Sequence, residues 1–235
     1  MWTQDNKRED YFLQGKNGLE TAVILSQEQY VAFGRKPRSY DLLGKLVQVV
    51  RVFEANGIRF ALIGGLAMGE RAIPRATKDV DFLVDGEDME KARHLLESYY
   101  REGNSDFMLF DIETVYVDLI AARLRFARRA VAEAELREVE GVRVPVVKSR
   151  DLLILKLIAA GDRRKSSGRL KDQSDSASLL EHAEELTAED YRYAARVLLE
   201  AFASPPERRE KYVALLRWMN EELESLGHGD WKVEL

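Results

Sequence analysis

The chain has 235 residues but no cysteine, and only three of its residues are histidine. Without cysteine the protein has no disulfide bond, no cysteine-zinc site and no thiol nucleophile. The histidines at 94, 182 and 228 stand far apart in the sequence, so a histidine-zinc site is not expected. No apolar run approaches the roughly 18 residues of a membrane span, and the first residues lack the apolar core of a signal peptide. We therefore expect a cytoplasmic protein with no membrane association.

The chain also lacks an excess of basic residues, because its formal net charge is −5. Proteins that coat nucleic acids usually carry a large positive charge, so that class is disfavoured. Two segments are nevertheless locally basic: residues 121–136, with Arg123, Arg125, Arg128 and Arg129, and residues 162–171. The sequence therefore predicts basic surfaces suited to an RNA backbone on a protein that is acidic as a whole.

The apolar periodicity predicts an α/β fold, with a mixed β-sheet flanked by helices and a helical C-terminal region. We expect an N-terminal extension over 1–38, a core over 39–148 and the helical region over 149–235. Ser39 and Ser149 are the expected N-caps of the first and fifth helices. Strands are predicted over 58–63, 80–84, 107–112, 115–120 and 142–147. Helices are predicted over 39–56, 66–71, 87–100, 121–136, 149–160, 172–185, 188–203 and 206–226.

The segment from Leu62 to Val84 carries the strongest chemical signal. Because strand side chains alternate between faces, Asp79 and Asp81 should point the same way. Two carboxylates so close repel each other unless a cation lies between them, and aspartate is depleted from strands. The Gly64–Gly65 turn, at the start of a short helix, offers backbone N–H groups suited to phosphate. These features predict phosphoryl or nucleotidyl transfer; the alternative is that the acids cap a helix or pair with nearby arginines, Arg71 and Arg75.

Asp118 is the expected third carboxylate. In the strand over 115–120 it shares a face with Tyr116, whereas the valines on either side of Tyr116 face the other way. If this strand lies beside the Asp79 strand, three acids meet and two metal ions can be held. Asp118 would then act as a metal ligand and as the general base for an attacking hydroxyl. Asp111 competes for this role and ranks lower.

A second group of charged residues follows in the helical region. Lys156 interrupts an apolar helix, and its ammonium group either reaches the surface or meets a negative partner such as a triphosphate. Arg163 and Lys171 are expected either in a solvated loop or against a phosphate backbone. Asp172 and Asp175 lie one helical turn apart and share a face; the simpler alternative is two acids at a helix N-terminus.

These residues resemble the signature of the nucleotidyltransferase superfamily, in the branch of the AbiEii abortive-infection toxins and minimal nucleotidyltransferases. The first part of the resemblance is a glycine pair followed by a basic Arg-x-Thr-x-Asp-x-Asp element, and the second is the lysine-bearing helix followed by a Lys-Asp pair. The resemblance extends over about residues 40–180. The matching positions are Gly64, Gly65, Arg75, Thr77, Asp79, Asp81, Lys156, Lys171 and Asp172.

The resemblance implies a nucleotidyltransferase-like fold, Mg²⁺, and transfer of a nucleoside monophosphate from an NTP to a hydroxyl. It assigns metal binding to Asp79 and Asp81, triphosphate contacts to Gly64 and Gly65, and positioning of the nucleotide to Lys156 and Asp172. Arg75, Thr77 and Lys171 complete the expected nucleotide-binding set. Some relatives modify tRNA ends and are toxins with a partner antitoxin.

The sequence thus predicts a Mg²⁺-dependent nucleotidyltransferase that acts on RNA, with a tRNA 3′ end as the favoured acceptor and a toxin–antitoxin role. One alternative is a non-catalytic module of the same fold that binds a nucleotide or a protein partner. Another is an antibiotic-type enzyme that modifies small molecules, which predicts an acidic acceptor pocket around Asp118.

Overall fold

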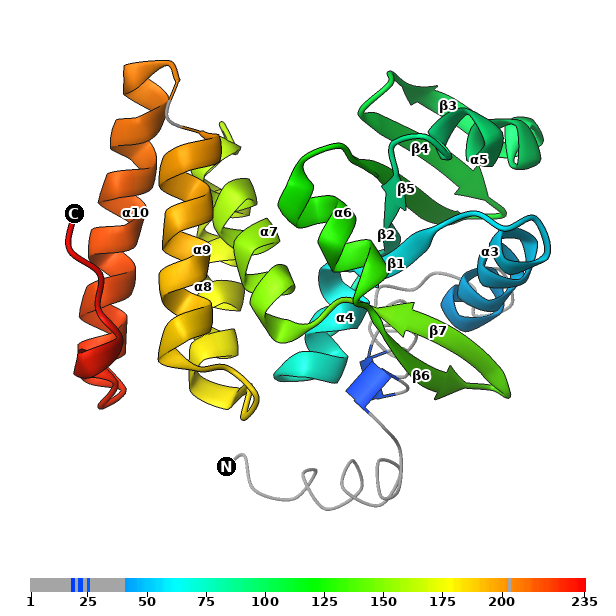
Figure 1. Cartoon of the computed structure of the whole chain (residues 1–235). Helices are drawn as coiled ribbons and strands as arrows, with labels where there is room; N and C mark the ends of the chain where they lie inside the picture. Colours follow the sequence, from blue (N-terminus) through cyan, green and yellow to red (C-terminus); the bar gives the residue numbers. More distant parts are fainter. Residues whose placement is uncertain (1–17, 20, 23–24, 26–40, 203) are drawn as a thin grey trace.

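A seven-stranded mixed sheet forms one half of the molecule, and a bundle of helices forms the other (Figure 1). The computed structural model describes residues 18–19, 21–22, 25, 41–202 and 204–235. The predicted extension over 1–38 lies almost entirely outside these residues. The predicted fold class, a mixed sheet flanked by helices with a helical C-terminal region, is confirmed; the predicted domain boundaries stay predictions.

The strand order is β3-β4-β5-β2-β1-β7-β6. The centre of the sheet combines both orientations, because β2 pairs antiparallel with β1 and parallel with β5. A tight turn joins β4 to β5, and Glu113 and Thr114 adopt positive φ there, as the predicted hairpin requires. The strands are β1 (Phe60–Ile63), β2 (Asp79–Asp85), β3 (Tyr100–Gly103), β4 (Phe107–Ile112), β5 (Val115–Ala122), β6 (Glu135–Val139) and β7 (Val142–Val146).

Helices α3 and α6 lie on opposite sides of the sheet, and α7 to α10 stand side by side beyond α6 (Figure 1). The helices of the sheet half are α3 (Leu42–Ala55), α4 (Gly64–Arg71), α5 (Met89–Leu95) and α6 (Arg125–Ala132), with the 3₁₀ turn η2 (Glu97–Tyr99). The bundle holds α7 (Ser149–Asp162), α8 (Ser166–His182), α9 (Ala188–Ala201), α10 (Pro206–Ser225) and the 3₁₀ turn η3 (Gly229–Trp231).

Helix α3 seals one face of the sheet. Its residue Phe53 packs edge-on against Phe60 of β1 and Phe82 of β2, with ring centroids 5.2 and 5.8 Å away. Such aromatic packing buries a large apolar area on that face. The N-cap is Asp41, whose side chain accepts a hydrogen bond from the Gly44 N–H, and not the predicted Ser39, which lies outside the described residues.

Two predicted helices are shorter than expected. The helix predicted over 87–100 ends at Leu95, and Tyr100 begins the edge strand β3. The basic helix predicted over 121–136 is only α6, because β5 continues to Ala122 and β6 begins at Glu135. In both cases pairing with a neighbouring strand, a tertiary effect, decides the boundary over local helical pattern.

The predicted basic loop over 162–171 is also wrong, since α8 already begins at Ser166. Only 163–165 separate α7 from α8, so Arg169 and Lys171 lie on the first turns of a helix and only Arg163, Arg164 and Lys165 lie in the connection. Ser149 is likewise the first residue of α7 rather than its cap, which is Lys148. The Ser149 hydroxyl donates to Glu185 instead, so a tertiary contact replaces the expected local one.

Arg71, at the end of α4, ties the sheet to the bundle. It is only 6% exposed, and it donates hydrogen bonds to the carbonyl groups of Val146 and Val147 at 3.2 and 2.8 Å. Its guanidinium also pairs with Glu135 of β6 and with Glu185, which precedes α9, at 2.9 and 3.4 Å. A buried guanidinium with this many acceptors holds several elements in one arrangement.

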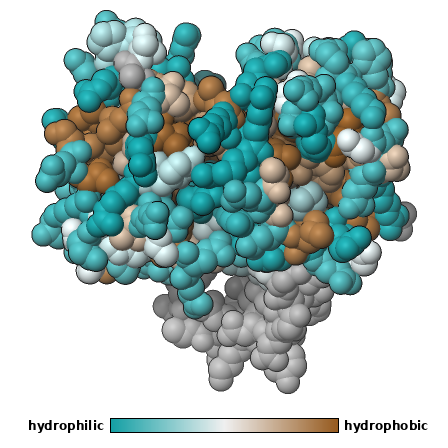
Figure 2. Space-filling view, viewed as in Figure 1, coloured by the Kyte–Doolittle hydropathy of each residue, from teal (hydrophilic) through white to brown (hydrophobic). Residues whose placement is uncertain are grey.

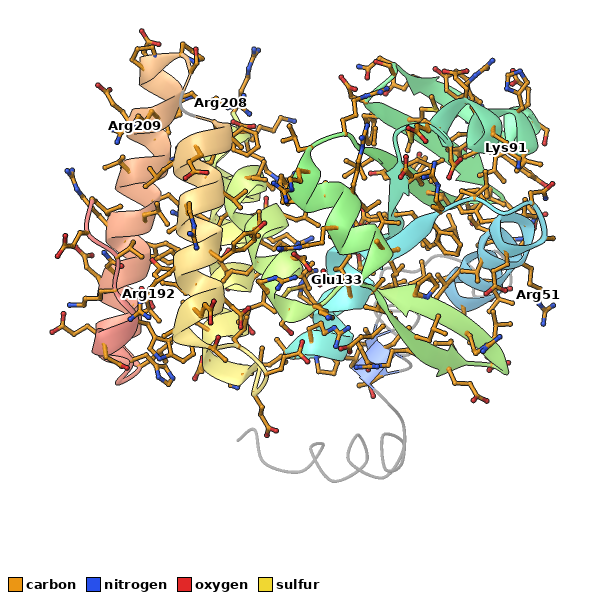
Figure 3. All side chains as sticks on the ribbon, in the orientation of Figure 1. Arg51, Lys91, Glu133, Arg192, Arg208 and Arg209 are labelled. Carbon is orange, nitrogen blue, oxygen red and sulfur yellow. The ribbon has the colours of Figure 1, made fainter. Side chains whose placement is uncertain are left out.

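Replacement of Arg71 by methionine should lower the free energy of unfolding by about 3–5 kcal/mol, because it leaves buried acceptors without a donor. Urea denaturation followed by circular dichroism measures this loss. Arg51→Met is the matched control: Arg51 is exposed on α3 and points away from the fold (Figure 3). Its loss should cost less than about 0.5 kcal/mol, and an equal cost for both variants would contradict the role of Arg71.

Candidate active site

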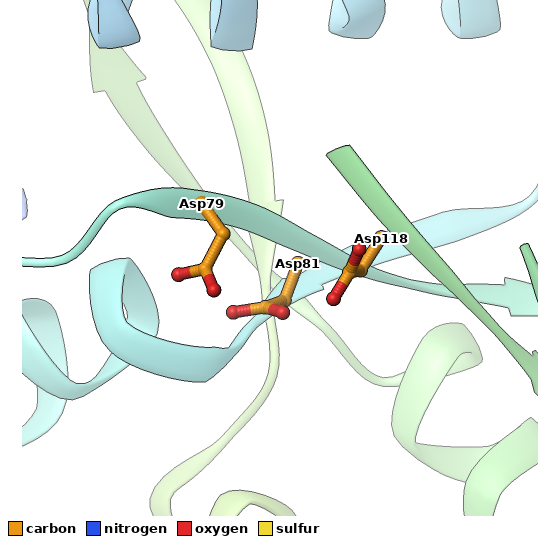
Figure 4. Close-up of side chains that lie close together, drawn as sticks. All are labelled: Asp79, Asp81 and Asp118. Carbon is orange, nitrogen blue, oxygen red and sulfur yellow. The ribbon is translucent and has the colours of Figure 1, made fainter. Parts of the chain in front are cut away.

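Three aspartates meet on the face of the sheet that α3 leaves uncovered (Figure 4). In β2 the side chains of Val80 and Phe82 are buried, whereas Asp79 and Asp81 are partly exposed on the other face. Asp118 of β5 lies directly opposite Asp81 in the parallel register. One carboxylate oxygen from each aspartate lies within 4.8 Å of the others. The predicted convergence of the three acids is therefore confirmed.

Two of the three carboxylates hold their protons more tightly than an ordinary aspartate does. Burial, together with the charges of Asp79 and Asp118, raises the pKa of Asp81 to about 7. Burial and the charge of Asp79 raise the pKa of Asp118 to about 6. These shifts are the expected result of placing like charges together in a partly dry site.

The acids fit a divalent cation. Oxygen donors are the ligands that Mg²⁺ prefers, and the Oδ1 of Asp118 is buried with no hydrogen-bond partner among the described residues. A buried acceptor without a partner is costly, and a bound cation would satisfy it. The three oxygen ligands and their uncompensated negative charge therefore suit Mg²⁺. That these residues bind a metal stays a prediction.

The two glycines let α4 begin directly against the acids. Gly64 has φ +69°, and a Cβ there would lie 1.8 Å from the Oδ2 of Asp81. A Cβ at Gly65 would lie 2.6 Å from the Oγ1 of Thr77. The N–H of Gly65 donates to Asp81, and Ile63, the N-cap of α4, supplies no capping side chain. The start of α4 thus brings backbone donors to the edge of the acid cluster.

Thr77 orients one of the three aspartates. Its hydroxyl donates to the Oδ1 of Asp79 at 2.6 Å, so it orients the first carboxylate of the three. The alternative in which Asp79 or Asp81 pairs with arginine is wrong. Arg71 pairs with Glu135 and Glu185, as described above, and Arg75 makes two hydrogen bonds to Asp175 at 3.0 and 2.8 Å.

A buried network of ion pairs stands behind the cluster. Lys156 is 8% exposed and its Nζ lies 2.7 Å from Asp175 and 3.5 Å from Asp172. Arg163 pairs with Asp172, and Arg75 with Asp175. Lys156 is close enough to Asp81 to favour its ionised form. Lys156 is therefore not a lysine that reaches the surface from an apolar helix.

Asp172 and Asp175 are buried members of this network, not acids at a helix N-terminus, because α8 begins at Ser166. Asp175 was not among the predicted site residues. The signal that could have identified it is its spacing of one helical turn from Asp172, since two acids on one buried face need cations.

Lys171, together with Lys156 and Arg75, forms a positively charged wall opposite the three aspartates. Burial and the nearby positive charge of Arg75 lower its pKa, and Asp79 and Lys156 are also among the charges it senses. Among the described residues it has no ion pair within 4 Å, unlike Lys156 and Arg75. The lower-ranked Asp111, by contrast, lies outside the cluster and pairs with Arg101 at 2.7 Å.

The sheet and the acid cluster define a protein of the nucleotidyltransferase class. The family model described as "Nucleotidyl transferase AbiEii toxin, Type IV TA system" matches residues 48–233. The chain therefore belongs to the AbiEii nucleotidyltransferase toxin family, as the resemblance indicated.

Solved structures show similar but distant folds. An antigenic nucleotidyltransferase-like protein from Paracoccidioides brasiliensis is 16% identical, with a TM-score of 0.44 over 75% of this chain and 94% of that one. The enzyme ANT(2'')-Ia, in complex with an adenylylated tobramycin, is 15% identical, with a TM-score of 0.43 over 75% of this chain and 98% of that one. No curated protein matches the chain significantly. None of the helices in the described residues has the length and apolar character needed to span a bilayer.

The raised pKa values predict how stability depends on pH without metal. Between the ordinary value of 3.8 and about 7 the folded protein holds protons on Asp81 and Asp118 that the unfolded chain has lost. The free energy of unfolding should therefore fall as the pH rises through this window. In EDTA, differential scanning fluorimetry should show a lower melting temperature at about pH 8 than at about pH 5.

The double variant Asp81→Asn/Asp118→Asn serves as the reference for all other titrating groups. It should lose much of this pH dependence, and Mg²⁺ at high pH should raise the melting temperature of the wild type only. A variant with the same pH profile and the same response to Mg²⁺ would show that the cluster does not bind the cation.

Proposed function

We propose that the protein transfers a nucleoside monophosphate from an NTP to an acceptor hydroxyl, and that Asp79, Asp81 and Asp118 hold two Mg²⁺ ions for this reaction. The observation that supports this most is the meeting of three carboxylates, one with an orphaned buried oxygen, between a helix start and a wall of cations. Bound Mg²⁺ would supply neutralisation of phosphate charge and activation of the attacking hydroxyl.

The triphosphate would lie between α4 and the bundle. The start of α4 suits a phosphate oxygen because a helix N-terminus attracts anions. The N–H of Gly65 already donates to Asp81, so the phosphate contact there is assigned to the N–H of Gly64. From the other side Lys171, which has no ion pair among the described residues, and Lys156 would neutralise the phosphates. Asp172 and Asp175 would hold Lys156 and Arg75 in position. Positioning and charge stabilisation of this kind provide most of the acceleration in phosphoryl transfer.

The acceptor would approach from the opposite side of the cluster. The α4 start follows β1 on one side of β2, whereas β5 and β4 lie on the other side. Asp118 is on that second side and would accept the proton of the acceptor hydroxyl. Tyr116, 50% exposed on the same strand face, would border the acceptor.

RNA is the acceptor we propose, with a tRNA 3′ end as the favoured form. The antibiotic-type alternative predicts an acidic acceptor pocket for a polycation. Among the described residues no second cluster of three acids accompanies the triad, and Asp111 on the neighbouring strand is neutralised by Arg101.

The family's description as a type IV toxin–antitoxin system supports a toxin role for this chain and an antitoxin encoded with it.

The substitution Asp118→Asn should lower the rate of transfer by at least about 100-fold, because it removes the proposed base, while the NTP still binds. Labelled NTPs incubated with bulk tRNA and Mg²⁺ measure transfer, and calorimetry measures NTP binding. Asp111→Asn makes the same chemical change on the adjacent strand and should leave the rate nearly unchanged.

Equal labelling by wild type and Asp118→Asn would refute the assigned base. Equal labelling by wild type and Asp79→Ala/Asp81→Ala would refute the metal role. Tight NTP binding with no pyrophosphate release for any acceptor would instead favour the non-catalytic module.

A further inference from the structure

A groove separates α6 from α9, on the far side of α6 from its own strand β5. Its volume is about 750 Å³, and its walls come from the start and body of α6 and from one face of α9. In Figure 2 hydrophilic side chains run down the middle of this side of the molecule, between two more apolar halves. No residue of the acid cluster or of the ion-pair network around Lys156 lines the groove.

Positive charge dominates the walls. Arg125 and Arg129 lie one turn apart on α6, Arg196 faces them from α9, and Glu200 is the one acidic residue in the lining. Arg129 pairs with Asp151 at 3.3 Å, whereas Arg125 and Arg196 have no such partner among the described residues. In a chain of net charge −5 this is a local concentration of cations, which favours recognition at one place over general coating.

An aromatic ring organises these guanidinium groups. The ring of Tyr193 on α9 has the Cζ of Arg129 4.4 Å from its centroid, that of Arg150 at 5.5 Å and that of Arg196 at 5.9 Å. Cation–π contacts hold arginines in place without neutralising their charge. The Nε of Arg129 is buried and makes no hydrogen bond in the described part of the chain; Glu133 lies 3.9 Å from it.

Apolar groups lie between the cations. Leu124, which caps the start of α6 and is 43% exposed, and Phe126 of α6 face Val197 and Ala201 from α9. A surface that alternates guanidinium groups, whose planes stack on bases, with apolar side chains matches a single strand of nucleic acid, which presents phosphates and unpaired bases in turn. An acidic protein segment would match the charge but has no bases to stack on the guanidinium planes.

We propose that the α6–α9 groove binds a single-stranded segment of RNA, with Arg125 and Arg196 contacting phosphates. The choice of RNA over DNA rests on the proposed function, in which the acceptor is RNA. The groove begins at Leu124, at most about 20 Å along the chain from Asp118, so a strand held there has its end within reach of the cluster. The groove thus retains the body of the acceptor while the cluster acts on its terminus.

The test is fluorescence anisotropy with a labelled RNA single strand of about 20 nucleotides, in EDTA and without NTP, so that the metal site takes no part. Arg125→Glu/Arg196→Glu reverses two groove arginines that have no ion pair among the described residues, and Arg129 is left intact because it pairs with the buried Asp151. The matched control is Arg51→Glu/Arg217→Glu, which reverses two exposed helical arginines on α3 and α10.

The groove variant should bind this RNA at least about tenfold more weakly than the wild type, and the control should bind nearly as well. Its slope of log K against log salt should be smaller by about 1.4, since each phosphate contact of a single strand contributes about 0.7. If charge reversal prevents folding, Arg125→Gln/Arg196→Gln supplies the same comparison with a smaller change.

Equal affinity of wild type and groove variant, or an equal loss in the control, overturns the proposal. So does a DNA strand of the same sequence that binds as well as RNA, or polyglutamate that displaces the RNA at equal charge. If no acceptor is ever labelled but RNA binding still depends on Arg125 and Arg196, the proposed transfer reaction is contradicted, whereas the proposed RNA-binding groove is supported.

Discussion

The mutual repulsion of Asp79, Asp81 and Asp118 is the constraint around which the rest of this structure is arranged. Two adjacent parallel strands bring three carboxylates to one partly buried place, and the register sets Asp81 against Asp118. Such an arrangement is unfavourable in isolation, as the raised pKa values of Asp81 and Asp118 show. A folded protein retains it only where something else compensates, and a divalent cation is the simplest compensation.

The surroundings of the acids are electropositive on two sides. The start of α4 contributes backbone donors, and Lys156, Arg75 and Lys171 contribute positive charge from the loop before β2 and from the bundle. Lys156 and Arg75 are themselves held by Asp175, so the positive wall is rigid. Among the described residues no ion pair within 4 Å joins these acids to these cations, although Lys156 favours the ionised form of Asp81. In the proposed function a triphosphate with its metal ions would bridge the two.

The parts of the site that could be predicted from the sequence are those that local periodicity determines. The alternation in DVD and in VYVDL placed Asp79, Asp81 and Asp118 on exposed strand faces, and the glycine pair indicated a helix start without side chains. The pairing of β2 with β5 was a condition of that prediction, not a result of it. Periodicity gives the face of each strand, but only the fold makes the two strands neighbours.

What the sequence could not give depends on contacts between distant segments. The sequence does not show that Lys156 pairs with Asp172 and Asp175, because the pairing requires α7 to pack on α8. The basic stretch before Lys171 was predicted as a loop because its helical turns lack an apolar pattern. The apolar pattern predicted a helix up to Tyr100 and therefore did not reveal strand β3. The α6–α9 groove is formed by segments that are about 70 residues apart in the sequence, so no local motif predicts it.

The most direct test of this account is a crystal structure with Mn²⁺ and a non-hydrolysable NTP, with the metal located by its anomalous scattering. The account predicts metal density between the carboxylates of Asp79, Asp81 and Asp118, with the triphosphate extending from it towards Gly64 and Lys171. A cluster that stays free of metal while a lysine or arginine side chain enters it, or a nucleotide bound elsewhere, would contradict the central claim.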